Sequence, residues 1–424
     1  MLDRKRVIIV GAGFAGLNCA KGLAEDAGCD VTLIDKNDYQ QFQPLLYQVA
    51  TGALSTQNAA FSLRVVFSEY DNVEILTSEI VSVDLDALTV TAKDGNRYTG
   101  DYLVLAAGTE VNFFNTLGSH EYSFPLYSLH DAERLRSRLF GLLEGADLNP
   151  ASMPEAGLSI VVVGGGPTGV EIAGAVVDIL RLTPKHTYPN IDLTSIAVTL
   201  VDAHHSVLGP FATESQEYAK EVLEERGVTV RLNTAVKEVT KDCVIFADGS
   251  KLASTLVIWA GGLRAASLSH AVASKAGAGG RLNVNDDLTI PGHPNAYALG
   301  DFANTKDESG AYLPQLGAVA QQAGKHCASN IIAEENGSDR TAFKYRDKGI
   351  MAMIGRNAAV AELGSQHFPI SGPLAFATWL GVHAALLTSF RAELEAMIEW
   401  TWDYARGIPM NPIRVHVEDD LQVR

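Results

Sequence analysis

One pattern occurs twice in the 424-residue chain and constrains its fold more than any other feature. A short apolar strand leads into a glycine-rich turn and a helical stretch, and a second strand then ends on an aspartate. The first copy starts at residues 6–10 and ends on Asp35, and the second starts at residues 159–163 and ends on Asp202. This order of elements predicts a nucleotide-binding βαβ unit, so the chain is expected to contain two of them.

The first glycine turn contains Gly11, Gly13 and Gly16. Gly11 permits the tight turn, Gly13 lets the backbone approach a diphosphate, and Gly16 lets the helix pack closely on the strand. The diphosphate is expected at the N-terminus of the helix, where free N–H groups and the helix dipole favour negative charge. Asp35 is expected to accept hydrogen bonds from a ribose.

The second copy predicts the identity of its nucleotide. Asp202 is expected to favour NADH over NADPH, because its carboxylate repels a 2′-phosphate. His204 and His205 follow it and would weaken this preference if protonated, although loop histidines of this kind are more often simply exposed. The glycines that take the same parts as in the first copy are Gly164, Gly166 and Gly169.

The remaining segments predict how the units are completed. Each unit is expected to continue with antiparallel strands, at residues 73–91 and 229–246, and to close with an apolar strand. The closing strands lie at 102–106 and 255–259. After the second unit we expect a strand at 295–299, a helix at 318–332, a strand pair at 348–362 and a mostly helical segment at 374–406. The fold class is α/β, with two Rossmann-like domains and a C-terminal helical segment.

Composition excludes several classes of protein. A formal net charge of −17 argues against a nucleic-acid ligand, which requires clustered Lys and Arg. The four cysteines have neither metal-ligand spacing nor the spacing of a redox pair, so no metal is expected and disulfide chemistry is excluded. The N-terminus lacks the apolar core of a signal peptide, which predicts a location on the cytoplasmic side.

Two dinucleotides in one chain indicate hydride transfer from a nicotinamide to a flavin, because this is the simplest chemistry that uses both. The flavin carries the difficult step, so no protein nucleophile is required. An alternative from another class is a nucleotide-dependent interaction module, in which NADH binding controls assembly.

A set of short motifs is spread over most of the chain, from residue 7 to about residue 403. They are at 11–17, 42–50 (FQPLLYQVA), 106–108, 112–114, 161–171, 259–262, 298–301 and 379–383 (WLGVH). Through these motifs the sequence closely resembles the type II NADH:quinone oxidoreductases, which are single-chain flavoproteins with two dinucleotide-binding domains. The resemblance implies peripheral attachment to the membrane, NADH and a quinone as substrates, and no proton pumping.

The resemblance also implies where the cofactors bind. FAD is expected at Gly11, Gly13, Gly16, Asp35, Lys36, Gly108 and Asp301, with residues 44–48, including Pro44 and Leu45, along the flavin ring. NADH is expected at Gly164, Gly166, Gly169, Asp202 and Gly262. The implied domains are 1–118 and 280–340 for FAD, 119–279 for NADH, and a C-terminal segment at 341–424.

Glu171, Gln321 and Gln322 are the candidate catalytic residues. The resemblance implies that Glu171 lies near the nicotinamide and takes part in quinone reduction, whereas its position alone equally fits an acid that stabilises a helix dipole. The family's quinone-side motif, approximately A-Q-x-A-x-Q-Q, corresponds to residues 317–323, where Ala318 replaces the first glutamine. Gln321 and Gln322 match the later glutamines, or else merely solvate one face of a helix.

The C-terminal segment combines an apolar stripe with an acidic rim. Glu393, Glu395, Glu399 and Asp403 outnumber Arg391 and Arg406, which weakens adsorption to anionic lipid. Membrane contact, a homodimer interface and packing within the chain therefore all remain open. The stripe consists of Trp379, His383, Leu386, Leu387, Phe390, Leu394, Met397 and Ile398.

The runner-up function is a soluble NADH-dependent flavin reductase of the same fold that acts on a specialised metabolite or a redox protein.

Overall fold

The computed structural model describes residues 4–26, 28–154, 157–272, 274, 276–387 and 390–406. The chain divides into two compact units, each assembled from three stretches of sequence. The first unit contains Met1–Gln41, Phe61–Glu110 and Leu263–Asp347, and the second contains Phe42–Ala60, Val111–Gly262 and Lys348–Arg424. Segment Phe42–Ala60 thus belongs to the second unit although first-unit sequence flanks it on both sides.

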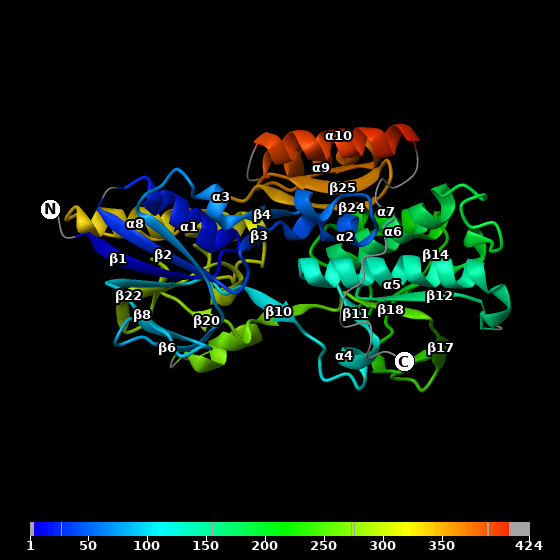
Figure 1. Cartoon of the computed structure of the whole chain (residues 1–424), viewed down its shortest axis with the longest axis horizontal. Coiled ribbons are helices and arrows are strands. Elements are labelled where there is room, and N and C mark those ends of the chain that lie inside the picture. The colour runs from blue at the N-terminus through cyan, green and yellow to red at the C-terminus, as the bar shows by residue number, and fades with distance from the viewer. Residues whose placement is uncertain are drawn as a thin grey trace. The chain divides into compact units, whose positions relative to one another are not determined.

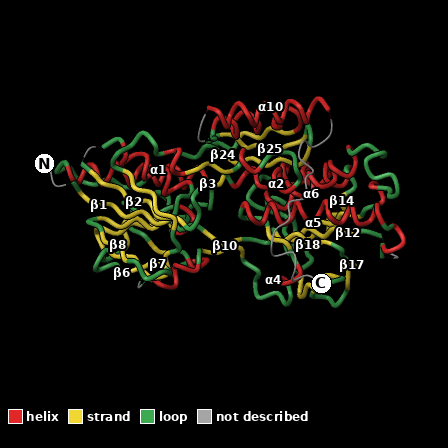
Figure 2. Tube along the Cα trace, viewed as in Figure 1, coloured by secondary structure: helices red, strands yellow, loops and turns green. Residues whose placement is uncertain are grey.

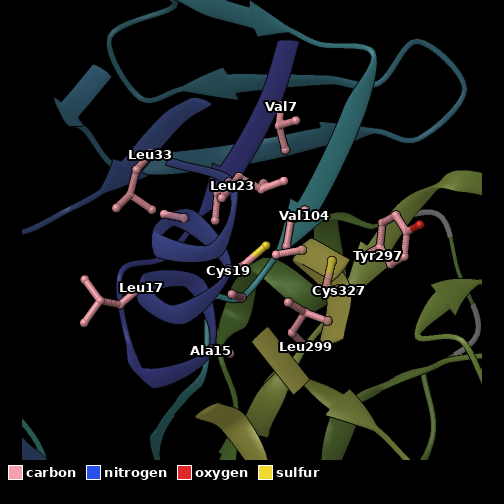
Figure 3. Packing of buried hydrophobic residues seen from close by; sticks show 14 of the residues in the cluster. Val7, Ala15, Leu17, Cys19, Leu23, Leu33, Val104, Tyr297, Leu299 and Cys327 are labelled. Carbon is pink, nitrogen blue, oxygen red and sulfur yellow. The ribbon is translucent and has the colours of Figure 1, made fainter. Parts of the chain in front are cut away.

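The first unit is built on a six-stranded sheet in the order β21-β22-β9-β1-β2-β5. Figure 1 labels three of these strands, β22, β1 and β2. Helices α1 (Phe14–Ala24) and α8 (Gly317–Glu335) pack side by side against it, and Figure 3 shows the buried core between them. The strands are β1 (Lys5–Val10), β2 (Cys29–Asp35), β5 (Val73–Thr77), β9 (Tyr102–Leu105), β21 (Thr289–Ile290) and β22 (His293–Ala298). A smaller antiparallel sheet contains β6 (Ile80–Asp84), β7 (Thr89–Ala92) and β8 (Arg97–Thr99).

The second unit repeats this plan with a parallel sheet in the order β11-β18-β12-β13-β14. Helix α6 (Pro167–Leu182) follows the second glycine turn, and α5 (Leu129–Leu148) and α7 (Thr213–Glu225) complete the layers. The strands are β11 (Phe124–Pro125), β12 (Ser159–Val163), β13 (Ala197–Val201), β14 (Val228–Arg231) and β18 (Leu256–Trp259). A separate antiparallel sheet contains β15 (Val236–Val239), β16 (Cys243–Phe246) and β17 (Lys251–Ala253).

Two strands differ from the sequence prediction. Strands β5 and β14 were expected to be antiparallel, but β5 pairs parallel with β2 and β14 pairs parallel with β13. Each of them follows a helix, α3 (Leu63–Val66) or α7, and a helical crossover returns the chain in the direction of the previous strand. The prediction was wrong because it overlooked these helices.

The C-terminal segment forms a small layer within the second unit (Figure 2). The expected strand pair is present as β24 (Gly349–Gly355) and β25 (Ala358–Leu363), and a third strand, β26 (Phe368–Ser371), extends it. Helix α9 (Gly372–Ala385) covers β25, and α10 (Phe390–Arg406) packs on α9. None of the helices within the described ranges is long and apolar enough to cross a bilayer.

Close contact between α6 and β24 depends on Gly174. A Cβ atom at this position would overlap the carbonyl oxygen of Ile354, so only glycine lets the helix approach the strand so closely. The first half of α6 therefore packs directly against β24 of the C-terminal layer.

Candidate active site

The first glycine turn has the geometry that a diphosphate requires. Gly11 has φ +100°, and a Cβ at either Gly11 or Gly16 would overlap a backbone oxygen. Gly13 faces open space, with nothing within 4 Å of an added Cβ. The turn is therefore closely packed against the backbone at Gly11 and Gly16 and is open at Gly13, where a ligand would approach.

The second glycine turn reproduces this arrangement. Gly164 has φ +111°, a Cβ at Gly169 would overlap the oxygen of Gly164, and Gly166 faces open space. Pro167 occupies the first position of α6, where its missing N–H does no harm. Two local sequences of the same kind have therefore built two equivalent turns.

The two strand-end aspartates bind the backbone of these turns. Asp35 accepts hydrogen bonds from the N–H groups of Ala12, at 2.7 Å, and Asn37, at 2.8 Å. Burial raises the pKa of Asp35, while those N–H groups oppose the shift. Asp202 likewise accepts from the N–H of Gly165.

His204 lies directly beside Asp202. Its backbone N–H donates to Asp202 Oδ1 over 2.6 Å, and its Nδ1 lies 2.8 Å from the same oxygen. The imidazole is otherwise exposed. A protonated His204 would therefore partly neutralise the carboxylate that is expected to discriminate against NADPH.

An Asp202→Asn variant is expected to raise kcat/KM for NADPH relative to NADH about fivefold, because removal of one charge repulsion in contact with water is worth about 1 kcal/mol. Asparagine keeps an oxygen that accepts from Gly165, so the turn should remain intact. The measurement is steady-state reduction of ferricyanide with each nucleotide, with Asp248→Asn, an acid in an exposed turn, as the control. An unchanged ratio would show that Asp202 does not select the nucleotide.

Asp301 lies in a short turn, η7 (Gly300–Phe302), in the first unit. Gly300 has φ +61°, and it packs against Ala15 of α1 and Ala320 of α8. Burial raises the pKa of Asp301 to about 6, and the positive charge of Arg281 opposes this shift. Asp301 is therefore held beside the helix that begins at the first glycine turn.

Segment Phe42–Ala60 contains Pro44 and Leu45, which are expected along the flavin ring; Pro44 is partly exposed. It contains η1 (Gln43–Leu45), with Pro44 near its start, then α2 (Leu46–Ala50) and η2 (Thr56–Asn58). Leu45 is fully buried and Tyr47 is 5% exposed. This segment packs within the second unit against α5 and α6.

Glu171 is a buried acid on α6, only 9% exposed. Its Oε1 accepts from the backbone N–H of Met353 on β24, over 3.3 Å. Burial raises the pKa of Glu171 to about 8, while the N–H of Met353 and the indole of Trp379 act in the opposite direction. At neutral pH this carboxyl is therefore mostly protonated, unlike a solvated acid that stabilises a helix dipole.

An aromatic cluster lies beside this acid, with Trp379 and Tyr47 near it. Trp379 stacks on His383 with ring centroids 3.8 Å apart, and it meets the edges of Tyr47 at 6.1 Å and Trp400 at 6.3 Å. Burial lowers the pKa of His383 to about 4, so its ring is neutral. The buried Nε1 of Trp379 is close enough to lower the pKa of Glu171 but lacks the geometry of a hydrogen bond to any described residue.

The predicted apolar stripe is divided between two environments. Trp379, His383 and Leu387 are buried, so they belong to packing within the chain. The exposed members are Leu386, Leu394, Met397 and Ile398, at 37%, 45%, 43% and 57%, and Leu374 and Trp402 add 66% and 49%. The side chains of Phe390, Arg391, Asp403 and Arg406 lie outside the described residues.

The two candidate glutamines lie on α8 in the first unit. Gln322 donates to the carbonyl oxygen of Arg346 and accepts from its N–H, both over 3.0 Å, which ties α8 to the following segment. Gln321 is partly exposed on the same helix. Their part in quinone reduction stays a prediction.

Sequence reasoning overlooked the hydrogen bonds of Tyr47, Gln48 and Trp400. Tyr47 and Gln48 fall in a quoted motif, which was the one available signal. Trp400 gives no signal, because its partner Gln48 is 352 positions away in the chain.

Comparison with known proteins identifies the class first. A family model described as pyridine nucleotide-disulphide oxidoreductase matches residues 5–324, and the chain belongs to this family. Such a fold requires two nucleotide sites, and the two glycine turns with Asp35 and Asp202 stay the predicted ones.

Full-length relatives then identify the branch of this class. The type II NADH:quinone oxidoreductase Ndh of Mycobacterium tuberculosis is 35% identical over 415 residues, covering 94% of this chain and 88% of the relative. The type II NADH:quinone oxidoreductase of Staphylococcus haemolyticus is 30% identical, covering 84% and 89%. The chain belongs to the type II NADH:quinone oxidoreductase family and is an oxidoreductase with FAD and NADH as its cofactors.

A solved structure shares the fold over nearly the whole chain. The NDH2 of Plasmodium falciparum, solved in complex with NADH, superposes with a TM-score of 0.86 at 22% identity, covering 96% of this chain and 99% of that one.

Proposed function

We propose that this chain oxidises NADH and passes two electrons to a quinone in a ping-pong reaction that pumps no protons. The observation that carries the proposal is Glu171, a buried carboxyl that retains its proton at neutral pH beside an aromatic cluster. Support also comes from the relatives named as NADH:quinone oxidoreductases.

The residues of the first unit fit FAD, because the open face at Gly13 and the helix N-terminus behind it suit a diphosphate. When bound, FAD accepts a hydride and releases its electrons to a second substrate. We assign its binding to Gly11, Gly13, Gly16, Asp35, Lys36, Gly108 and Asp301, and we expect Pro44 and Leu45 along the flavin ring. We assign NADH to Gly164, Gly166, Gly169, Asp202 and Gly262.

Glu171 would supply a proton to the quinone. A quinone that takes up two electrons also takes up two protons, and a neutral carboxyl within reach of its oxygen acts as a general acid. Burial among apolar and aromatic side chains keeps this acid protonated at pH 7, where an ordinary glutamate would have lost its proton.

Anaerobic reduction with NADH, followed by stopped-flow reoxidation with menadione, tests the proposal. We expect reduction of the flavin by NADH and rapid reoxidation by menadione and by menaquinone or ubiquinone analogues. Reoxidation by quinones no faster than by air would exclude a quinone as the acceptor. It would leave the runner-up function, which Ala318 favours: an NADH-dependent flavin reductase with another acceptor.

We also propose peripheral contact with the cytoplasmic face of a membrane through α9 and α10. The exposed apolar side chains of these helices support it. One member of the acidic rim, Glu399, accepts a hydrogen bond from the backbone N–H of Ser55, so its charge is partly compensated within the chain. Co-sedimentation with zwitterionic liposomes measures this contact, and a protein that stays in the supernatant would contradict it.

A further inference from the structure

Helix α10 makes hydrogen bonds to the segment that carries Tyr47. The indole Nε1 of Trp400 donates to Gln48 Oε1 over 2.7 Å, and the neighbouring Glu399 accepts from the N–H of Ser55 over 3.0 Å. Gln48 in turn donates from Nε2 to the hydroxyl oxygen of Tyr47 over 2.9 Å. Trp400, Gln48 and Tyr47 therefore form a chain of hydrogen bonds within the second unit.

The direction of this chain follows from the chemistry of its first member. An indole N–H only donates, so Trp400 keeps the amide oxygen of Gln48 turned toward itself. The amide nitrogen then faces Tyr47 and donates to the phenol oxygen. As a result the hydroxyl of Tyr47 accepts from Gln48 and must direct its own proton elsewhere.

No described residue accepts that proton. Within the described ranges, the one side-chain hydrogen bond of Tyr47 is the bond that it accepts from Gln48. Tyr47 is buried against Trp379, and it is close enough to Glu171 that ionisation of this acid would raise the pKa of the phenol further. A buried donor without an acceptor costs about 1–3 kcal/mol, so this geometry fits an acceptor atom that a ligand brings.

Burial raises the pKa of Tyr47 well above its usual range, and the charge of Glu171 adds to this shift. The phenol is thus neutral and keeps its proton throughout the working pH range.

We propose that the hydroxyl of Tyr47 donates a hydrogen bond to a carbonyl oxygen of the quinone, and that Trp400 is a positioning residue that keeps this donor available through Gln48. The inference rests on the proposed function. Without the indole N–H, the amide of Gln48 is free to turn over. Its oxygen would then accept a hydrogen bond from the hydroxyl of Tyr47, and this donor would no longer be available to the substrate.

The test compares four variants of the holoenzyme: Tyr47→Phe, Trp400→Phe, the double variant, and Trp402→Phe as the matched control. Trp402 lies on the same helix and is 49% exposed. Each NADH-reduced protein is mixed anaerobically with menadione and, separately, with ferricyanide, which takes single electrons and has no carbonyl oxygen. The readout is the ratio of the two reoxidation rates, so losses of cofactor or folding cancel.

Tyr47→Phe is expected to lower the menadione-to-ferricyanide ratio about tenfold, the value of one neutral hydrogen bond. Trp400→Phe is expected to lower it about threefold to tenfold, since the amide regains freedom to turn over. The double variant should match Tyr47→Phe, and Trp402→Phe should match the wild type.

Two results would overturn the inference while menadione still reoxidises the wild type rapidly. An unchanged ratio in Tyr47→Phe would show that the hydroxyl does not contact the quinone. Equal losses from Trp400→Phe with and without Tyr47 would show that Trp400 acts through packing. Failure of menadione to reoxidise the wild type would instead contradict the proposed function itself.

Discussion

A Glu171→Gln variant is expected to reduce quinone about 100- to 10,000-fold more slowly than the wild type, the range typical for loss of a general acid. Glutamine has nearly the same shape, and it retains an oxygen that accepts from Met353. The pKa of Glu171 is about 8, so the wild-type rate should be constant below pH 8 and fall above it as the proton is lost. The measurement is stopped-flow reoxidation by menadione between pH 6 and about pH 10, and the variant should show no transition near pH 8.

Stability supplies an independent check on the same carboxyl. Its pKa rises from 4.5 to about 8 on folding, so the folded state binds the proton more tightly than the unfolded state does. The stabilisation is complete below pH 4.5 and is lost as the pH rises through 8. Compared with Glu171→Gln, the wild type should therefore become progressively less heat-stable across that interval. A difference in Tm between the wild type and Glu171→Gln that stays the same at every pH would contradict a buried, protonated carboxyl.

Two substitutions in the second turn, Gly169→Ala and Gly166→Ala, are expected to have different effects: the first on stability and the second on NADH binding. Gly169→Ala should destabilise the second unit by about 3 kcal/mol, because its Cβ overlaps the oxygen of Gly164 inside a packed contact. Gly166→Ala should melt like the wild type, since nothing lies within 4 Å of the new Cβ. Its methyl group occupies the space assigned to the diphosphate, so NADH should bind about 100-fold more weakly.

Differential scanning calorimetry and titration with NADH measure these two effects separately. Gly209→Ala is the matched control, because an added Cβ there also meets nothing within 4 Å and the position lies outside the turn. A Gly166→Ala protein that binds NADH normally would place the nucleotide elsewhere, whatever its melting temperature.

Local sequence determined the two nucleotide-binding units. The conformation of a glycine turn depends on a few neighbouring residues. The strands, turns and helices of both units can therefore be identified, before any long-range contact is known, from Gly11, Gly16, Gly164 and Gly169. The same reasoning located the closing strands and the C-terminal strand pair. It failed for β5 and β14, where strand direction depends on the preceding helices rather than on the strand's own residues.

Only the tertiary structure revealed the surroundings of Glu171 and Tyr47, the residues that we propose act on the quinone. From its sequence position Glu171 could have been a solvated helix acid. Its burial, and its proximity to Met353 and Trp379, which follow it by about 200 residues in the chain, are visible only in the tertiary structure. The orientation of Tyr47 likewise depends on Trp400, a partner that no spacing in the sequence connects to it. Protonation and hydrogen-bond direction are set by what surrounds a side chain, whereas a glycine turn is set by the residues beside it in the chain.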